Sequence, residues 1–162
     1  MKENAMSSKA LPDAGAVVRL VTSLVGKQVT QKPGPVLKQL PKGGVVGVFR
    51  NDAQEIVVLV VADLPLAAAG GAALAMIPAA AAQDAVRSGA LPPNMAENFR
   101  EVINVMSGVL TGGGNRAVRL SEFTVGTLPE LAADVFSAPG GRLDLELDIQ
   151  GYGKGALSFI AA

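Results

Sequence analysis

The strictest periodic pattern in the chain lies near its end, where apolar and polar residues alternate over residues 142–150. Leucine or isoleucine occupies the odd positions from 143 to 149, and Asp, Glu or Gln occupies the even positions from 144 to 150. Successive side chains of a strand point to opposite faces, so the alternation predicts a strand with one buried and one acidic face. Glycines at 151, 153 and 155 predict a turn, and residues 156–161 return as the last strand. We expect the acidic side to be a solvated or edge face rather than a cation site, because no carbonyl-rich loop accompanies it.

Segments bounded by turn-forming residues, most of them rich in apolar or β-branched residues, predict four more strands. They are expected at residues 27–31, 45–49, 56–62 and 117–125. The second and third of these form a hairpin through the turn-prone segment 50–52. The third is apolar throughout, which is typical of a central strand covered on both faces.

Helical spacing and capping residues predict helices around these strands. The expected helices lie between Asp13 and Gly26 and at residues 64–76, 79–87 and 129–136. Asp63 and Pro78 stand immediately before two of them, where a capping residue or a proline commonly starts a helix. Gly70 and Gly71 inside the first alanine-rich helix predict close packing against another element.

A longer amphipathic helix is predicted after the prolines at 92 and 93, and it carries the candidate chemistry. Its apolar residues recur at helical spacing and are Met95, Phe99, Val102, Ile103, Met106 and Leu110. Glu101 and Asn104 fall opposite this stripe, so a carboxylate and a carboxamide share one solvent-facing patch, with Gly108 one turn further on. Asn94 and Glu97 resemble a capping box at the start of the helix.

An exposed Glu and Asn on a helix most often serve only solubility. The amino-acid composition excludes several other kinds of functional site. The chain has no His, Cys or Trp, which excludes a Ser-His-Asp triad, a cysteine nucleophile and a histidine or thiolate metal site. Fourteen basic residues balance fourteen acidic ones, and only 4% of residues are aromatic. We therefore expect no nucleic-acid partner.

The length of 162 residues predicts one domain, with a disordered tail at residues 1–12 and a single domain at 13–162. The polar start of the chain is not followed by an apolar signal segment. The longest apolar run, residues 56–82, is broken by Asp63, Pro65 and Pro78, so we expect no transmembrane span and a cytoplasmic protein. The fold class predicted is α/β (α+β), with a mixed, mainly antiparallel sheet covered by helices.

The order of these elements, together with the Glu-x-x-Asn-x-x-x-Gly helix, resembles the CheC/CheX/FliY family of response-regulator phosphatases. The likeness is greatest to CheX, which has one such signature helix per chain, and it spans residues 13–160. Glu101 and Asn104 match the signature pair. The family usually has Asp or Ser four residues before the Glu, where this chain has Glu97, and Pro129 stands only roughly where the family has a later proline.

The resemblance implies a CheX-like fold, a homodimer and a phosphatase that acts on the aspartyl phosphate of a receiver domain. Glu101 would fix the docking of the helix and Asn104 would align the attacking water, while the partner would hold the divalent cation (Mg²⁺), so no cofactor is expected on this chain. The substituted Glu97 favours an alternative, a non-catalytic CheC-like interaction module in signalling or in a flagellar-type assembly. An unrelated α/β domain that binds a small ligand is a third possibility, although the sequence shows no dedicated pocket residues.

Overall fold

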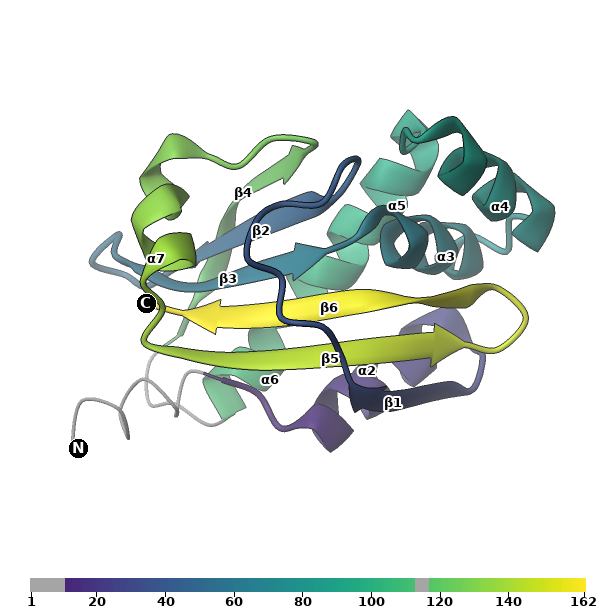
Figure 1. The fold of residues 1–162 in the computed structure, drawn as a ribbon. Helices are drawn as coiled ribbons and strands as arrows, with labels where there is room; N and C mark the ends of the chain where they lie inside the picture. The colour runs from purple at the N-terminus through teal and green to yellow at the C-terminus, as the bar shows by residue number, and fades with distance from the viewer. Residues whose placement is uncertain (1–10, 113–116) are drawn as a thin grey trace.

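A six-stranded sheet forms the centre of the computed structural model, which describes residues 11–112 and 117–162 (Figure 1). Its strand order is β1-β5-β6-β3-β2-β4. The strands are β1 Val29–Pro33, β2 Val45–Arg50, β3 Ile56–Ala62, β4 Arg119–Val125, β5 Gly141–Ile149 and β6 Gly153–Ala161. Every strand pair among the described residues is antiparallel. The α+β class is confirmed, and the predicted hairpin at residues 45–62 is present as β2 and β3.

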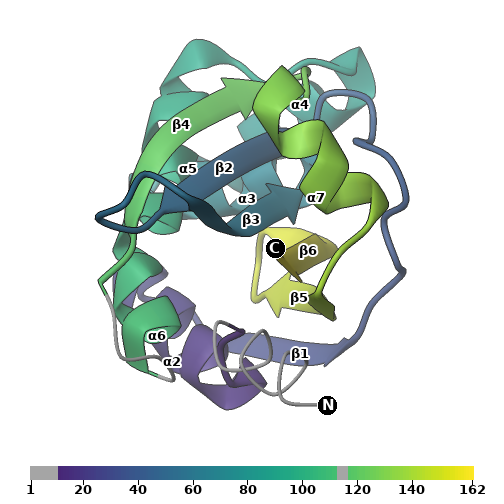
Figure 2. The same ribbon diagram turned by 90° about the vertical axis from the view of Figure 1, so that its left-hand side faces the viewer.

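Helices cover one face of this sheet and a shorter helical segment covers part of the other. The helices are α2 Ala14–Val25, α3 Leu64–Leu74, α4 Ala79–Ser88, α5 Pro93–Val105, α6 Ser107–Gly112, the 3₁₀ turn η1 Glu130–Ala132 and α7 Ala133–Ser137. Figure 2 shows β4 at the top and β1 at the bottom, with α2 and α6 to the left of the sheet and α7 to the right. The molecule is therefore layered, with a sheet between two unequal covers.

The main core lies between the sheet and helices α2, α3 and α5. Alternate residues of the central strands point into it and meet the apolar stripe of α5. The sheet contributes Val45, Phe49, Val58, Val60, Leu145, Leu147, Ile149, Leu157 and Phe159, all of them buried. The whole predicted stripe of the long helix is buried as well, from Met95 to Leu110. Burial of this stripe orients α5 and leaves its opposite side to the solvent.

A second, smaller core lies on the other face of the sheet, under η1, α7 and residues 34–44. Its buried members are Val46, Val48, Leu59, Val61, Ala132, Phe136 and Ile160. In Figure 1 the segment that follows β1 crosses in front of β5 and β6 before it reaches β2. Strand β3 contributes side chains to both cores, which confirms the prediction of a central strand covered on both faces.

The hairpin at residues 142–161 lies inside the sheet, so of the two positions expected for the acidic strand, a solvated face or an edge, the edge is excluded. Strand β5 pairs with β6 on one side and with β1 on the other, from Val29 opposite Ile149 to Pro33 opposite Leu145. The edges are β1 and β4. The alternation showed correctly which face of β5 is polar, but a period of two carries no information about which strands lie beside it.

Helices α3 and α5 approach closely because α3 carries glycine where α5 crosses it. A Cβ at Gly71 would lie 2.3 Å from the carbonyl oxygen of Met95, and one at Gly70 would lie 2.9 Å from the Phe99 ring. The side-chain amide of Asn98 also donates to the Gly71 carbonyl at 3.0 Å. The close packing predicted for the two glycines is confirmed, and it fixes the position of α5 on the sheet.

Caps and chain ends follow the sequence signals in most places. Asp13 accepts from the Ala16 N–H at 3.1 Å, and Gly26 ends the same helix in the left-handed conformation. The tail predicted at residues 1–12 lies outside the described residues except for its last two, of which Pro12 is buried. No helix in the described ranges is long and apolar enough to cross a membrane.

Candidate functional site

Helix α5 carries the candidate residues, and its start is set by two prolines. Pro92 occupies the N-cap position and Pro93 the first turn, where a fixed φ and a missing N–H suit a helix start. Asn94 is therefore already inside the helix, and its side chain accepts from the Met95 N–H at 2.9 Å. The predicted capping box of Asn94 and Glu97 is wrong, because Pro93 begins the helix before Asn94 can cap it.

Glu101 and Asn104 both lie exposed on α5, opposite its buried stripe. They are three residues apart, so their side chains leave neighbouring positions of the same helix surface. Within residues 11–112 and 117–162, neither side chain has a hydrogen bond or an ion pair. The structure therefore places both predicted residues together and leaves a carboxylate and a carboxamide free to meet another molecule.

Gly108 lies beyond the end of α5, in the short helix α6. Helix α5 ends at Val105, and the Met106 N–H donates to the Ile103 carbonyl at 3.0 Å in a tightened last turn. A Cβ at Gly108 would meet no atom within 4 Å. Helix packing therefore does not require a glycine at this position.

Three further residues of α5 are accessible beside the candidate pair. Glu97 and Arg100 are exposed, and Val105 keeps 38% of its surface accessible. The predicted site did not include Arg100, although it stands four residues before Asn104 and so one turn away on the same side. Helical spacing alone could have identified it.

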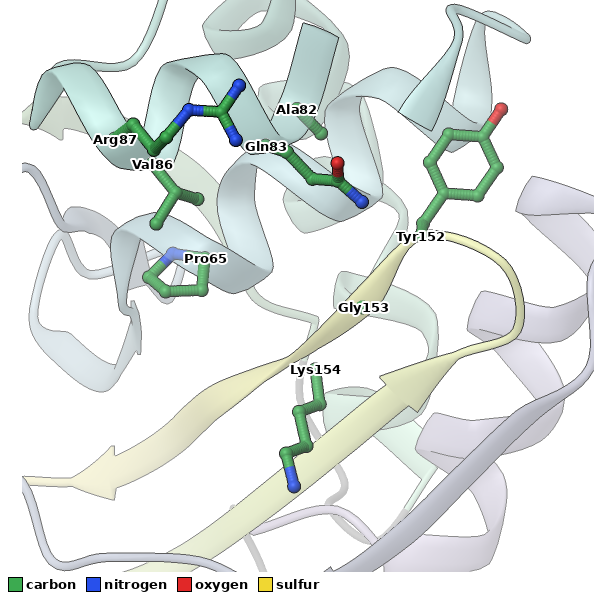
Figure 3. A pocket seen from close by; sticks show the side chains of 8 residues that line it. All are labelled: Pro65, Ala82, Gln83, Val86, Arg87, Tyr152, Gly153 and Lys154. Atoms are coloured by element: carbon green, nitrogen blue, oxygen red, sulfur yellow. The ribbon is translucent and has the colours of Figure 1, made fainter. Parts of the chain in front are cut away.

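A shallow pocket lies elsewhere, between α4, the start of α3 and the start of β6 (Figure 3). It encloses about 300 Å³ and is lined by Pro65, Ala82, Gln83, Val86, Arg87, Tyr152, Gly153 and Lys154. Arg87 is paired with Asp84, and the Tyr152 hydroxyl donates to the Ile77 carbonyl at 2.7 Å. In Figure 3 the Lys154 side chain points away from α4. No residue of α5 lines this pocket, so it is separate from the candidate site.

Two of the three carboxylates on the acidic face of β5 have nearby donors. Arg142 donates to both carboxylate oxygens of Asp144, at 2.8 and 3.2 Å, and Ser158 donates to the same carboxylate at 2.6 Å. Lys32 pairs with Glu146 at 3.2 Å. Arg142 also donates to the Leu37 carbonyl at 2.9 Å, which ties the segment 34–44 to the sheet. In the described part of the chain, no group of three or more acidic residues could hold a metal ion.

Asp63 has a perturbed carboxyl group, and the perturbation has a structural cause. Burial raises the pKa of Asp63 above its usual value, the nearby Glu146 raises it further, and the hydrogen bond from the Leu66 N–H opposes the shift. That hydrogen bond, 3.0 Å long, caps α3 as predicted. Because the side chain is engaged in the cap, we assign it a structural role.

Comparison with known proteins identifies the fold. Neither a protein-family model nor a curated protein matches the sequence. Among solved structures, the FliM middle domain from H. pylori has a TM-score of 0.65 and 10% identity, covering 91% of this chain and 84% of that chain. FliY from Thermotoga maritima has a TM-score of 0.58 and 12% identity, covering 99% and 90%.

The chemotaxis protein CheX from Vibrio vulnificus has a TM-score of 0.53 and 13% identity, covering 90% of this chain and 93% of that chain. These TM-scores establish a common fold, and at identities of 10–13% the likeness shows the fold alone. The chain therefore has the fold shared by CheX, FliY and the FliM middle domain, as its resemblance to the CheC/CheX/FliY family predicted.

Proposed function

We propose that this protein is a phosphatase for the aspartyl phosphate of a response-regulator receiver domain, which it engages through the exposed face of α5. The observation that carries the proposal is the pair on that face: Glu101 and Asn104 are exposed and neighbouring, and they lack partners within the described ranges. The fold shared with CheX and FliY supports it.

The reaction needs no covalent intermediate on this protein, because phosphoryl transfer depends mainly on the alignment of the reacting groups and on charge stabilisation. The water oxygen forms a bond to phosphorus while the bond from phosphorus to the aspartyl oxygen breaks. The bonding electron pair stays on the aspartate carboxylate, and both protons of the water leave with the phosphate, as dihydrogen phosphate or as hydrogen phosphate plus a solvated proton. A chain without histidine or cysteine can support such a step if it holds the water in line.

Asn104 is the residue proposed to hold that water. Its carboxamide oxygen can accept a hydrogen bond from the water, and its NH₂ group can donate to a phosphoryl oxygen, without any change in protonation. Glu101, three residues before Asn104 on the same surface of the helix, would pair with a cation on the receiver and so fix the orientation in which the helix docks. In this proposal the receiver would supply the divalent cation.

The test measures decay of a phosphorylated receiver. Receiver domains of the source organism are phosphorylated with acetyl phosphate, freed of the donor, and followed with and without this protein. Asn104→Ala should slow the accelerated decay by about 10²–10³, the usual cost of losing one well-placed polar contact at a transition state. Binding should persist, because the variant keeps Glu101.

Gln83→Ala is the matched control, since it removes another exposed carboxamide from a helix, α4, that does not carry the candidate pair. It should leave the decay rate within about twofold of wild type, in line with the small effects of exposed substitutions. If wild type and Asn104→Ala both leave the decay equal to that of the receiver alone, for every receiver tested, the phosphatase proposal is wrong.

A second candidate function is a non-catalytic interaction module on the same fold. The FliM middle domain matches with a higher TM-score than CheX, 0.65 against 0.53. Glu97 also stands where the CheC/CheX/FliY family usually has Asp or Ser. Under this alternative the α5 face binds a partner, and neither Asn104→Ala nor Glu101→Ala changes any rate of dephosphorylation.

A further inference from the structure

We propose that Arg100 recognises the phosphoryl group of the docked receiver and gives the α5 face its preference for a phosphorylated partner. The proposal rests on the proposed function, in that it takes the exposed face of α5 as the docking surface. It adds a specificity-determining residue outside the Glu-x-x-Asn pair.

The position of Arg100 brings it close to Asn104 on the surface of α5. Residues four apart on a helix lie one above the other, and both of these residues are exposed. A helical side chain leans toward the N-terminus of its helix, so Asn104 extends over the turn that carries Arg100. A phosphoryl group held against the Asn104 carboxamide would therefore lie within reach of a long, flexible guanidinium.

The guanidinium of Arg100 is available for such a contact. Arg50, Arg87 and Arg142 each have acidic partners. Arg100, in contrast, has no ion pair or hydrogen bond from its side chain within the residues that the structure describes. Glu97 lies three positions before it and Glu101 directly after it, yet neither carboxylate comes within ion-pair distance of its nitrogen atoms.

The other charges on α5 would repel a phosphoryl group near Asn104. Arg100 is the one basic residue in the helix sequence, and Glu97 and Glu101 both point to the same exposed side. The last turn of a helix also carries partial negative charge, because its carbonyl groups lack donors. A doubly charged phosphoryl group near Asn104 would meet repulsion from the two carboxylates and from the helix end. Arg100 offsets this repulsion.

Arginine is also well suited to recognise a phosphoryl group. Its planar guanidinium can donate two parallel hydrogen bonds to two phosphoryl oxygens, whereas a lysine ammonium acts as a single point of charge. The contact would form only when the receiver is phosphorylated. Arg100 thus provides selection between the two states of the partner, and Glu101 provides docking to either state.

The experiment measures binding to two forms of the same receiver domain. One form carries Mg²⁺ alone, and the other carries Mg²⁺ with beryllofluoride, which mimics the aspartyl phosphate. Wild type should bind the beryllofluoride form more tightly. Arg100→Ala should lower the ratio of the two affinities by about tenfold or more, the effect expected for a hydrogen bond to a charged group. Arg100→Lys should restore part of the ratio.

Two further variants separate this role from general effects of charge. Arg19→Ala removes an exposed arginine from α2 and should leave the affinity ratio unchanged. Glu101→Ala should weaken binding to both forms of the receiver by a similar factor. If Arg100→Ala weakens both forms equally, or leaves both unchanged, the role of Arg100 in phosphoryl recognition is overturned.

The same samples distinguish failure of this inference from failure of the proposed function. If wild type prefers the beryllofluoride form without accelerating decay, and Arg100→Ala loses that preference, the phosphatase proposal is wrong and the role of Arg100 in recognition is supported. If wild type accelerates decay while Arg100→Ala keeps both the preference and the rate, the role of Arg100 is overturned and the phosphatase proposal is supported. If wild type binds neither form of any receiver, both are overturned.

Discussion

Asp63 shows how one residue links the sheet to its helical cover. Its side chain caps α3, and its backbone N–H donates to the Ala156 carbonyl of β6 at 3.1 Å. Gly155 lies so close that a Cβ there would be 2.4 Å from the Asp63 carboxylate. The cap is therefore held in a crowded, partly dry position, which is why its carboxyl group ionises less readily than usual.

This position makes the stability of the protein depend on pH in a defined direction. The folded state holds the Asp63 proton to a higher pH than the unfolded chain does, so the contribution of Asp63 to the free energy of unfolding falls as pH rises from about 4 through the folded pKa. Asp63→Asn keeps an oxygen for the Leu66 N–H and removes the ionisation. The stability of Asp63→Asn minus that of wild type should therefore rise with pH and then level off.

Urea unfolding of both proteins at a series of pH values between about 4 and 7 measures this difference, because contributions from other groups largely cancel in the subtraction. A difference for Asp63→Asn that falls as pH rises would contradict the prediction.

At Glu101 the expected effect is on docking. Glu101→Ala should weaken docking to the receiver by roughly fivefold, equivalent to about 1 kcal/mol for an exposed ion pair. The rate of dephosphorylation should recover at high receiver concentration, which titration of the decay rate against receiver concentration would show. The melting temperature should hardly change, because the side chain is exposed. A rate that stays low at saturating receiver would assign Glu101 to the chemical step instead.

At the scale of elements, the contact between α3 and α5 positions the whole candidate surface. Gly71→Ala would place a methyl group 2.3 Å from the Met95 carbonyl oxygen, so one helix must move. We expect a loss of about 1–3 kcal/mol in unfolding free energy, as for other overpacked sites. Denaturant unfolding followed by circular dichroism measures it.

Gly108→Ala is the matched control for this substitution. It adds the same methyl group at a helical glycine where the new Cβ would have no packing neighbour within 4 Å. The substitution should therefore leave the unfolding free energy unchanged or raise it by up to about 1 kcal/mol. Equal losses in the two variants would show that close packing at Gly71 is not the cause.

At the scale of the whole molecule, the strand order limits where the expected homodimer could pair through the sheet. Strands β5 and β6 are interior, and the open edges belong to β1 and β4. Strand β1 ends in Pro33, which lacks an N–H, whereas β4 runs over seven residues without a proline. If the chain dimerises through a sheet edge, β4 is therefore the better surface.

Light scattering at micromolar concentration should give about twice the chain mass of 16.4 kDa. Amide exchange in β4 should also slow as the protein concentration rises, because pairing would protect its outward N–H groups. A mass of one chain at every accessible concentration would remove the dimer and leave the fold unaffected.

The sequence by itself determined the elements and the polarity of their faces, because periodicity and capping depend on local geometry. Alternation identified the buried and acidic faces of β5, and the apolar stripe of α5 predicted which side would carry Glu101 and Asn104. Asp13 and Asp63 cap the helices that they were predicted to start. Each of these signals arises within a few residues of chain.

The tertiary structure decided what depends on contacts between distant segments. It placed β1 beside β5 and so made the acidic strand interior, a pairing for which no sequence period exists. It also left Arg100 without a partner among the described residues, on the same surface as Asn104. The candidate pair could be read from one helix, but its neighbours and its accessibility depend on how that helix packs on the sheet.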